Sequence, residues 1–195
     1  MTVSSVAIFH SVLGVRQGVT DLASLFESNG HRVVVVDQYE GRIFDDYETA
    51  SGYVDEVGFP ALMRVALDAV ADLDDGFFVA GFSNGAGMAQ HVALNRRTAG
   101  ALLLSGAMPI QYLGAETWPQ ATPVQIHFTL GDPFHDDDGP EQFAQQVLAS
   151  RASLEFYEYP GSGHLFTDPS LPGEYDARGA ALVAARSLRF VDDSD

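Results

Sequence analysis

Short apolar runs alternate with longer segments of helical periodicity along the whole chain. The apolar runs cover 6–9, 33–36, 77–80, 101–104, 124–128 and 154–159. Most are apolar on both faces, as strands must be when helices cover a sheet on two sides. The helical segments lie near 16–28, 60–73, 85–96, 139–150 and 176–190. This alternation predicts an α/β fold with a mostly parallel six-stranded sheet and helices on both faces.

Three irregular stretches follow predicted strands, and we expect them to form the walls of a ligand pocket. They cover 38–58, 107–122 and 160–175, and they are rich in glycine, proline, tyrosine and acidic residues. Ligands of open α/β sheets bind at the carboxyl ends of the strands, where such loops gather.

Composition removes several classes of function. The 195 residues suffice for one domain, 1–195, and carry 10 basic against 27 acidic side chains, a net charge of −17. That charge repels nucleic acids and anionic lipids, so neither partner is expected, whereas a homodimer is left open. The chain has no lysine and no cysteine, which excludes Schiff-base chemistry and thiol nucleophiles. The first residues lack a basic segment followed by an apolar run, so a cytoplasmic location is predicted.

The strongest local motif is Gly81-Phe-Ser83-Asn-Gly85, which lies between an apolar strand and a helical segment. In this context G-x-S-x-G is typical of a nucleophile elbow, a tight turn that exposes the serine above the sheet. The glycines are needed because the turn leaves no room for side chains beside the serine. An ordinary glycine-rich turn between a strand and a helix is the alternative interpretation.

A nucleophilic serine needs a base, and the base needs a carboxylate that orients it. Asp132 follows one late strand and His164, in Gly161-Ser-Gly-His164, follows the last one. The order Ser83, Asp132, His164 is that of α/β hydrolases, and we expect the three side chains to converge at one edge of the sheet. His31, His91 and His127 lie in predicted helices, strands or their ends, and we interpret them as structural.

The loop after the first strand, His10-Ser11-Val12-Leu13-Gly14, lies where an oxyanion hole needs its second amide. We expect the N–H of Val12 to act with that of Asn84, the residue after the nucleophile. His135 and the aspartates 136–138 suggest a metal cluster, but a solvated helix start is the simpler interpretation. No metal or organic cofactor is predicted.

Together these motifs resemble the dienelactone hydrolase family of the α/β hydrolases. The resemblance covers essentially the whole chain and includes Val36-Asp-Gln-Tyr39-Glu-Gly-Arg42 and Tyr159-Pro-Gly-Ser-Gly-His164-Leu-Phe166. It implies a compact α/β-hydrolase fold and a small ester or lactone as substrate. The implied substrate pocket contains Ser11, Leu13, Tyr39, Arg42 and Phe166.

Two departures from the family pattern bear on mechanism and substrate. Ser83 stands where the name-giving enzymes have cysteine, and Asp168 stands where they have an arginine that holds the substrate carboxylate. We therefore predict a serine hydrolase that acts through an acyl-enzyme and prefers a neutral ester. The competing hypothesis is a catalytically silent α/β-hydrolase fold that binds a ligand. A fluorophosphonate probe separates the two, because it labels only an activated serine.

Overall fold

The computed structural model describes residues 3–135 and 139–193, and its core is one six-stranded sheet. The strands are β1 (Ser5–Phe9), β2 (Arg32–Val36), β3 (Phe77–Phe82), β4 (Thr98–Leu104), β5 (Val124–Thr129) and β6 (Leu154–Tyr159). Their order is β2-β1-β3-β4-β5-β6, and every neighbouring pair is parallel. The predicted fold class is therefore confirmed.

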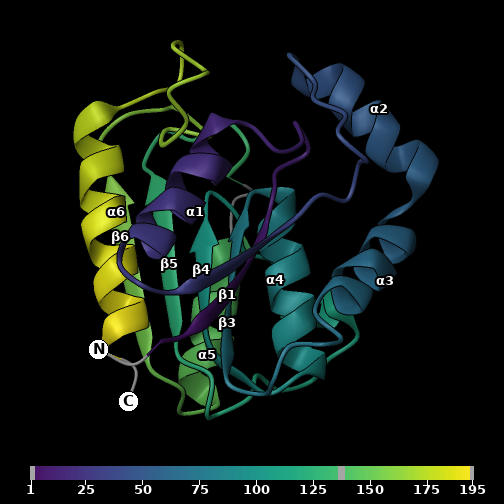
Figure 1. Ribbon diagram of the computed structural model, residues 1–195, viewed down its shortest axis with the longest axis vertical. Coiled ribbons are helices and arrows are strands. Elements are labelled where there is room, and N and C mark those ends of the chain that lie inside the picture. The colour runs from purple at the N-terminus through teal and green to yellow at the C-terminus, as the bar shows by residue number, and fades with distance from the viewer. Residues whose placement is uncertain (1–2, 136–138, 194–195) are drawn as a thin grey trace.

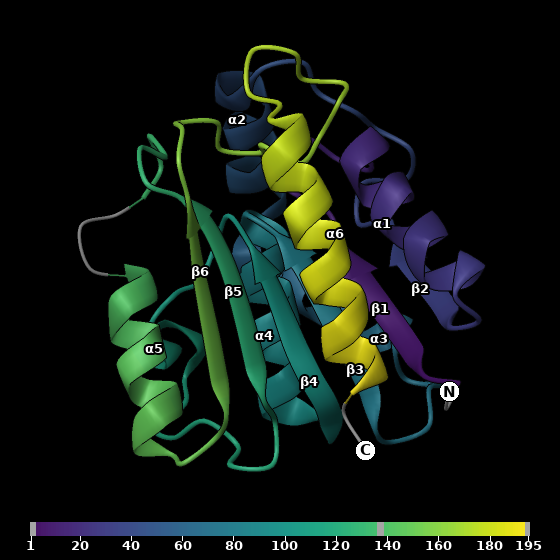
Figure 2. The same cartoon turned by 90° about the vertical axis from the view of Figure 1, so that its left-hand side faces the viewer.

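Helices cover both faces of the sheet, with α1 and α6 on one side and α3 and α4 on the other (Figure 1, Figure 2). The helices are α1 (Gln17–Ser28), α2 (Tyr47–Val57), α3 (Phe59–Ala69), α4 (Asn84–Asn95), α5 (Gly139–Ala149) and α6 (Ala177–Asp192). Alternate residues of β1 show the division: Ala7 and Phe9 belong to the cluster with α3, α4 and α5, whereas Val6 and Ile8 pack with α1 and α6. Two buried cores explain why the strands are apolar on both faces.

The helix α2 differs from the prediction, which treated 38–58 as irregular. Asp46 caps it by accepting a hydrogen bond of 2.7 Å from the Thr49 amide, and Gly58 ends it with a φ of 83°. Of its residues, all described by the structure, only Ala50 is buried. Ala50, Tyr53, Val54 and Val57 nevertheless recur at helical spacing, and the last three pack partly buried against the core, so the glycine and acidic residues of this stretch masked a helical pattern.

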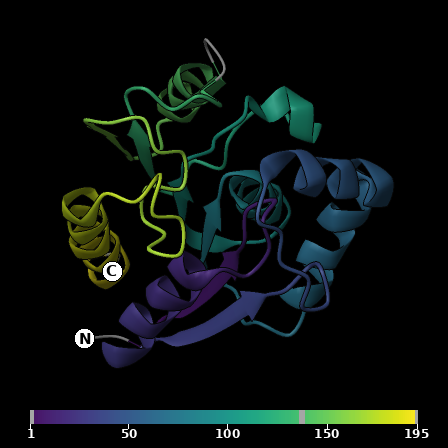
Figure 3. The same ribbon diagram turned by 90° about the horizontal axis from the view of Figure 1, so that it is seen from above.

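The parallel strands bring their carboxyl ends to one edge of the sheet. The helix α2 and the loop between β6 and α6 lie at this end of the molecule, and Figure 3 looks down on it. The loops that follow β1, β3, β5 and β6, which carry the predicted site, therefore meet above the sheet.

A buried polar network in β5 makes the stability of the fold depend on pH. The ring of His127 is fully buried between the Tyr159 hydroxyl, 2.8 Å from Nδ1, and the Gln125 side-chain oxygen, 2.9 Å from Nε2. Arg186 donates to the same Tyr159 hydroxyl at 2.9 Å. Burial lowers the pKa of His127 from 6.5 to about 3, so the ring is neutral in the folded protein.

We expect this histidine to destabilise the folded state as pH falls from 6.5 towards about 3. In that window the unfolded chain binds a proton at His127 that the folded chain does not, so stability rises with pH. The difference in bound protons approaches one, so His127 adds up to about 1.4 kcal/mol per pH unit to the slope of the unfolding free energy against pH. Urea unfolding at a series of pH values measures the free energy of unfolding. Its slope against pH should be shallower for His127→Asn than for the wild type. Equal slopes would contradict a neutral, buried His127.

Candidate active site

Ser83 lies at a sharp turn between β3 and α4. Its backbone has a φ of 51° and a ψ of −115°, a combination that is strained for any residue other than glycine. A Cβ atom on Gly81 would overlap the backbone oxygen of Gly85, and one on Gly85 would overlap the backbone oxygens of Phe9 and His10. Both motif glycines are therefore required by close backbone approach, and the turn has the geometry of a nucleophile elbow.

The structure brings Ser83, His164 and Asp132 together from the ends of three strands. His164 Nε2 lies 2.7 Å from Ser83 Oγ, and His164 Nδ1 lies 2.8 Å from each carboxylate oxygen of Asp132. His164 and Asp132 are buried, whereas Ser83 is half-buried. The ionised carboxylate only accepts, so Nδ1 carries the proton and Nε2 is free to accept the hydroxyl proton of Ser83.

Neighbouring hydrogen bonds fix the loop that carries His164. The Ser105 hydroxyl donates to the His164 carbonyl at 2.5 Å, and the Thr129 hydroxyl donates to the Gly163 carbonyl at 2.9 Å. Asp132 is also held, because its Oδ1 accepts from the Phe134 amide at 2.9 Å. The backbone around His164 is thus held by hydroxyl groups just after β4 and at the end of β5.

The loop after β1 lies directly against the elbow, since the Phe9 and His10 carbonyls touch Gly85. It turns tightly, with Ser11 Oγ accepting from the Leu13 amide at 3.1 Å. Within the described residues, no hydrogen bond uses the amide of Val12 or that of Asn84. Both N–H groups are therefore left without a hydrogen-bond partner by the described residues.

His10 is not free to act as a base. Its Nδ1 donates to the Ser11 carbonyl at 2.7 Å, and its Nε2 accepts from the Gln38 amide at 3.0 Å. Burial lowers the pKa of His10, so the ring stays neutral and holds the loop after β1 in place.

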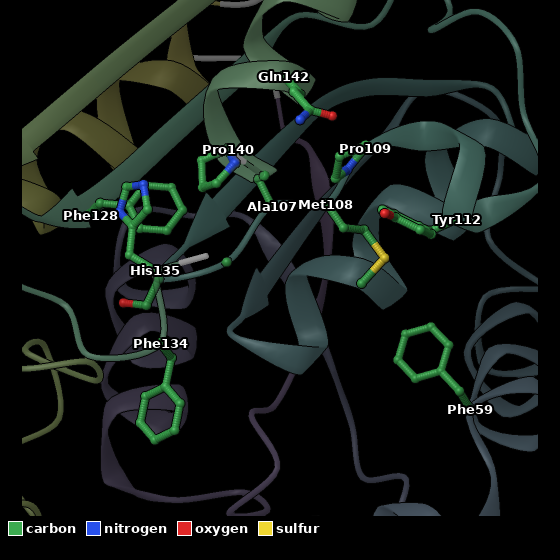
Figure 4. Close-up of a pocket in the computed structure, with 13 residues that line it drawn as sticks. Phe59, Ala107, Met108, Pro109, Tyr112, Phe128, Phe134, His135, Pro140 and Gln142 are labelled. Atoms are coloured by element: carbon green, nitrogen blue, oxygen red, sulfur yellow. The ribbon is translucent and has the colours of Figure 1, made fainter. Parts of the chain in front are cut away.

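A cavity of about 560 Å³ opens beside the triad, and Figure 4 shows its walls. Gly106, one of its lining residues, packs against the backbone of Ser83. The ring of Phe134, another, lies 4.7 Å from the ring of His164 between centroids. Its other described lining residues are Phe59, Ser105, Ala107, Met108, Pro109, Tyr112, Phe128, His135, Gly139, Pro140 and Gln142.

The five residues expected in the substrate pocket do not line this cavity. Ser11, Leu13, Tyr39 and Phe166 are buried. Tyr39 packs against His10 with ring centroids 4.4 Å apart, and Phe166 packs against Tyr159 at 5.1 Å. Arg42 is exposed, with its guanidinium 5.1 Å from the ring centroid of Tyr53. The five predicted pocket residues therefore include none of the described residues that line the cavity.

Asp168, which stands where the name-giving enzymes have an arginine, does not line the cavity. It is buried, and its Oδ1 accepts from the amide and the hydroxyl of Ser170 at 2.8 and 2.7 Å. Its Oδ2 lies 3.9 Å from Arg16 Nε. The carboxylate is therefore compensated inside the protein, and repulsion of anionic substrates cannot be attributed to it.

Comparison with known proteins settles the family. A profile of the dienelactone hydrolase family matches residues 2–194. The chain belongs to the dienelactone hydrolase family. This membership makes it a hydrolase of the ester- and lactone-cleaving kind.

Solved structures of this family have the same fold. A dienelactone hydrolase-like promiscuous phosphotriesterase from metagenomic libraries superimposes with a TM-score of 0.81 at 18% identity, over 97% of this chain and 86% of that one. A putative dienelactone hydrolase from Klebsiella pneumoniae gives 0.75 at 19% identity, over 96% and 86%. At such identities the likeness establishes the fold alone. No curated protein sequence matches the chain significantly.

The described residues show neither a metal-binding group nor a membrane-spanning helix. In residues 3–135 and 139–193, no three His, Asp or Glu side chains are grouped so that they could hold a metal ion. The metal cluster considered for His135 includes residues 136–138, which lie outside the described residues. None of the described helices is long and apolar enough to cross a membrane.

Proposed function

We propose that the protein is a serine hydrolase that cleaves a small, neutral ester or lactone through a Ser83–His164–Asp132 triad. The observation that carries the proposal is the unbroken hydrogen-bond chain from Ser83 Oγ through both ring nitrogens of His164 to the Asp132 carboxylate. A silent ligand-binding fold would have no need of this chain or of the strained Ser83 backbone.

The reaction follows from these contacts. Ser83 Oγ attacks the ester carbonyl while His164 Nε2 takes its proton, and Asp132 stabilises the resulting imidazolium. The negative charge on the former carbonyl oxygen is bound by the amides of Val12 and Asn84, aided by the N-terminus of α4. The imidazolium protonates the departing alcohol, which leaves an acyl-Ser83 ester. Water, deprotonated by the same imidazole, attacks that ester, and its collapse releases the acid and restores Ser83.

The direct test is turnover of a neutral short-chain aryl ester by the purified protein. A burst of phenol equal to the enzyme concentration, followed by slower turnover, is expected when deacylation is slower than acylation. The complete absence of hydrolysis across neutral aryl esters and lactones would favour the silent fold instead.

We assign the apolar part of the substrate to the cavity beside the triad. Its walls are largely aromatic, methionine and proline side chains, with Met108 and Phe59 on one side and Phe134 on another (Figure 4). No arginine occurs among its described lining residues. A carboxylate placed there would lose water without gaining an arginine or lysine partner.

We therefore expect kcat/KM for a neutral aryl ester to exceed that for a matched ester with a free carboxylate on its acyl chain. The expected ratio is at least about tenfold, or roughly 1.4 kcal/mol of transition-state free energy. Steady-state kinetics at two salt concentrations provide the measurement, because a preference caused only by net charge would fade in salt. A higher kcat/KM for the anionic ester would overturn the assignment and restore a dienelactone-like substrate.

A further inference from the structure

The segment that follows His164 folds back and holds the catalytic histidine from both sides. The Glu174 carboxylate accepts from the Leu165 amide at 2.6 Å, one residue after His164. The Glu174 carbonyl lies so close to Gly163, one residue before His164, that a Cβ atom on Gly163 would overlap it. One residue therefore packs against both neighbours of the histidine.

The same carboxylate is tied to the helix α2. The Tyr47 hydroxyl donates to it, 2.9 and 3.0 Å from its two oxygens. The ring of Tyr47 lies edge-on to the ring of His164, with centroids 5.8 Å apart, and 4.8 Å from the ring of Phe134 at the cavity wall. Burial, reinforced by Glu174, raises the pKa of Tyr47, so its hydroxyl keeps its proton and remains a donor.

From these contacts we propose that Glu174 is a positioning residue for His164 and that Tyr47 fixes Glu174. The inference rests on the proposed function, because the residue that Glu174 positions is the histidine of the proposed triad. Ser105 and Thr129 hold carbonyl oxygens of the loop, at His164 and Gly163. The Glu174 carboxylate instead accepts from a donor of the loop, the amide of the buried Leu165.

The consequence for catalysis is geometric. Without an acceptor, the Leu165 amide would be buried and unpaired, and the loop would shift to find a partner. His164 must keep both of its short hydrogen bonds, to Ser83 and to Asp132, and a displacement of about 1 Å can cost about a hundredfold in rate. Substrate binding in the cavity depends much less on this loop, so the loss should fall on kcat.

The test compares Glu174→Ala, Glu174→Gln and Tyr47→Phe by steady-state kinetics on a neutral aryl ester. Glu174→Ala is expected to lower kcat by about 10- to 100-fold with KM within about threefold. Glu174→Gln keeps an oxygen that can accept from Leu165 and should recover most of kcat. Tyr47→Phe keeps the ring but not the hydrogen bond, and a loss of about three- to tenfold in kcat is expected.

Matched controls separate positioning from general damage. Tyr175→Phe removes a hydroxyl from an exposed tyrosine of the same loop, and Glu56→Ala removes a carboxylate from the exposed side of α2; neither should change kcat. If Glu174→Ala does not fold, Tyr47→Phe decides, and an unchanged kcat in it overturns the proposal. A kcat for folded Glu174→Ala within about twofold of the wild type overturns it as well.

The rate of fluorophosphonate labelling distinguishes this inference from the proposed function. A wild type that labels at Ser83, with a tenfold or slower rate in Glu174→Ala, supports both. Labelling at Ser83 that is equally fast in Glu174→Ala would overturn the positioning role alone. Failure of the active wild type to label at Ser83 would overturn the proposed function, and with it the positioning role of Glu174.

Discussion

Replacing Ser83 by alanine will lower kcat for a neutral aryl ester by at least about a thousandfold. The variant loses the nucleophile that His164 activates at 2.7 Å, and loss of a triad nucleophile removes several orders of magnitude in other hydrolases. The fold should persist, because alanine retains the backbone of the turn and the side chain of Ser83 is half-buried rather than part of the core. Circular dichroism and thermal unfolding check this. Activity above about a tenth of the wild type would refute the assignment.

Replacing His164 by glutamine is expected to cost a similar factor, because no base then accepts the Ser83 proton. The double variant with Ser83→Ala should be no worse than either single one, since the two residues act as a unit. Asp132→Asn should also be severely impaired, because its amide favours the wrong histidine tautomer. His91→Gln, on α4, is the control and should remain active. A His164→Gln variant with wild-type kcat would require another base.

Much of the fold was predictable because a short, fully apolar run of sequence indicates a strand that is buried on both faces. Runs such as 77–80 and 101–104 are apolar throughout, and both lie in strands covered on two sides. The helix α2 was missed because the glycine, tyrosine and acidic residues of 38–58 indicated a loop, although Ala50, Tyr53, Val54 and Val57 recur at helical spacing.

The convergence of Ser83, Asp132 and His164 was predictable, because each lies in a short motif that follows a strand. The cavity was harder, since its walls combine Phe59, Met108 and Phe134 from separate segments without any shared pattern. The irregular stretch 107–122 did indicate one wall, which contains Met108 and Tyr112. The burial of Asp168 was not predictable, because its partner Arg16 is remote in sequence and a buried ion pair of this kind leaves no local signal.

Labelling with a fluorophosphonate, followed by mass spectrometry of the digested protein, shows whether Ser83 is the nucleophile. We expect one adduct per chain, on Ser83, with loss of ester hydrolysis in proportion to labelling. Ser83→Ala should not be labelled, and His164→Gln should be labelled far more slowly, because the serine is then not activated. An active protein that hydrolyses neutral esters without forming an adduct on Ser83, or that loses activity through an adduct elsewhere, would contradict it.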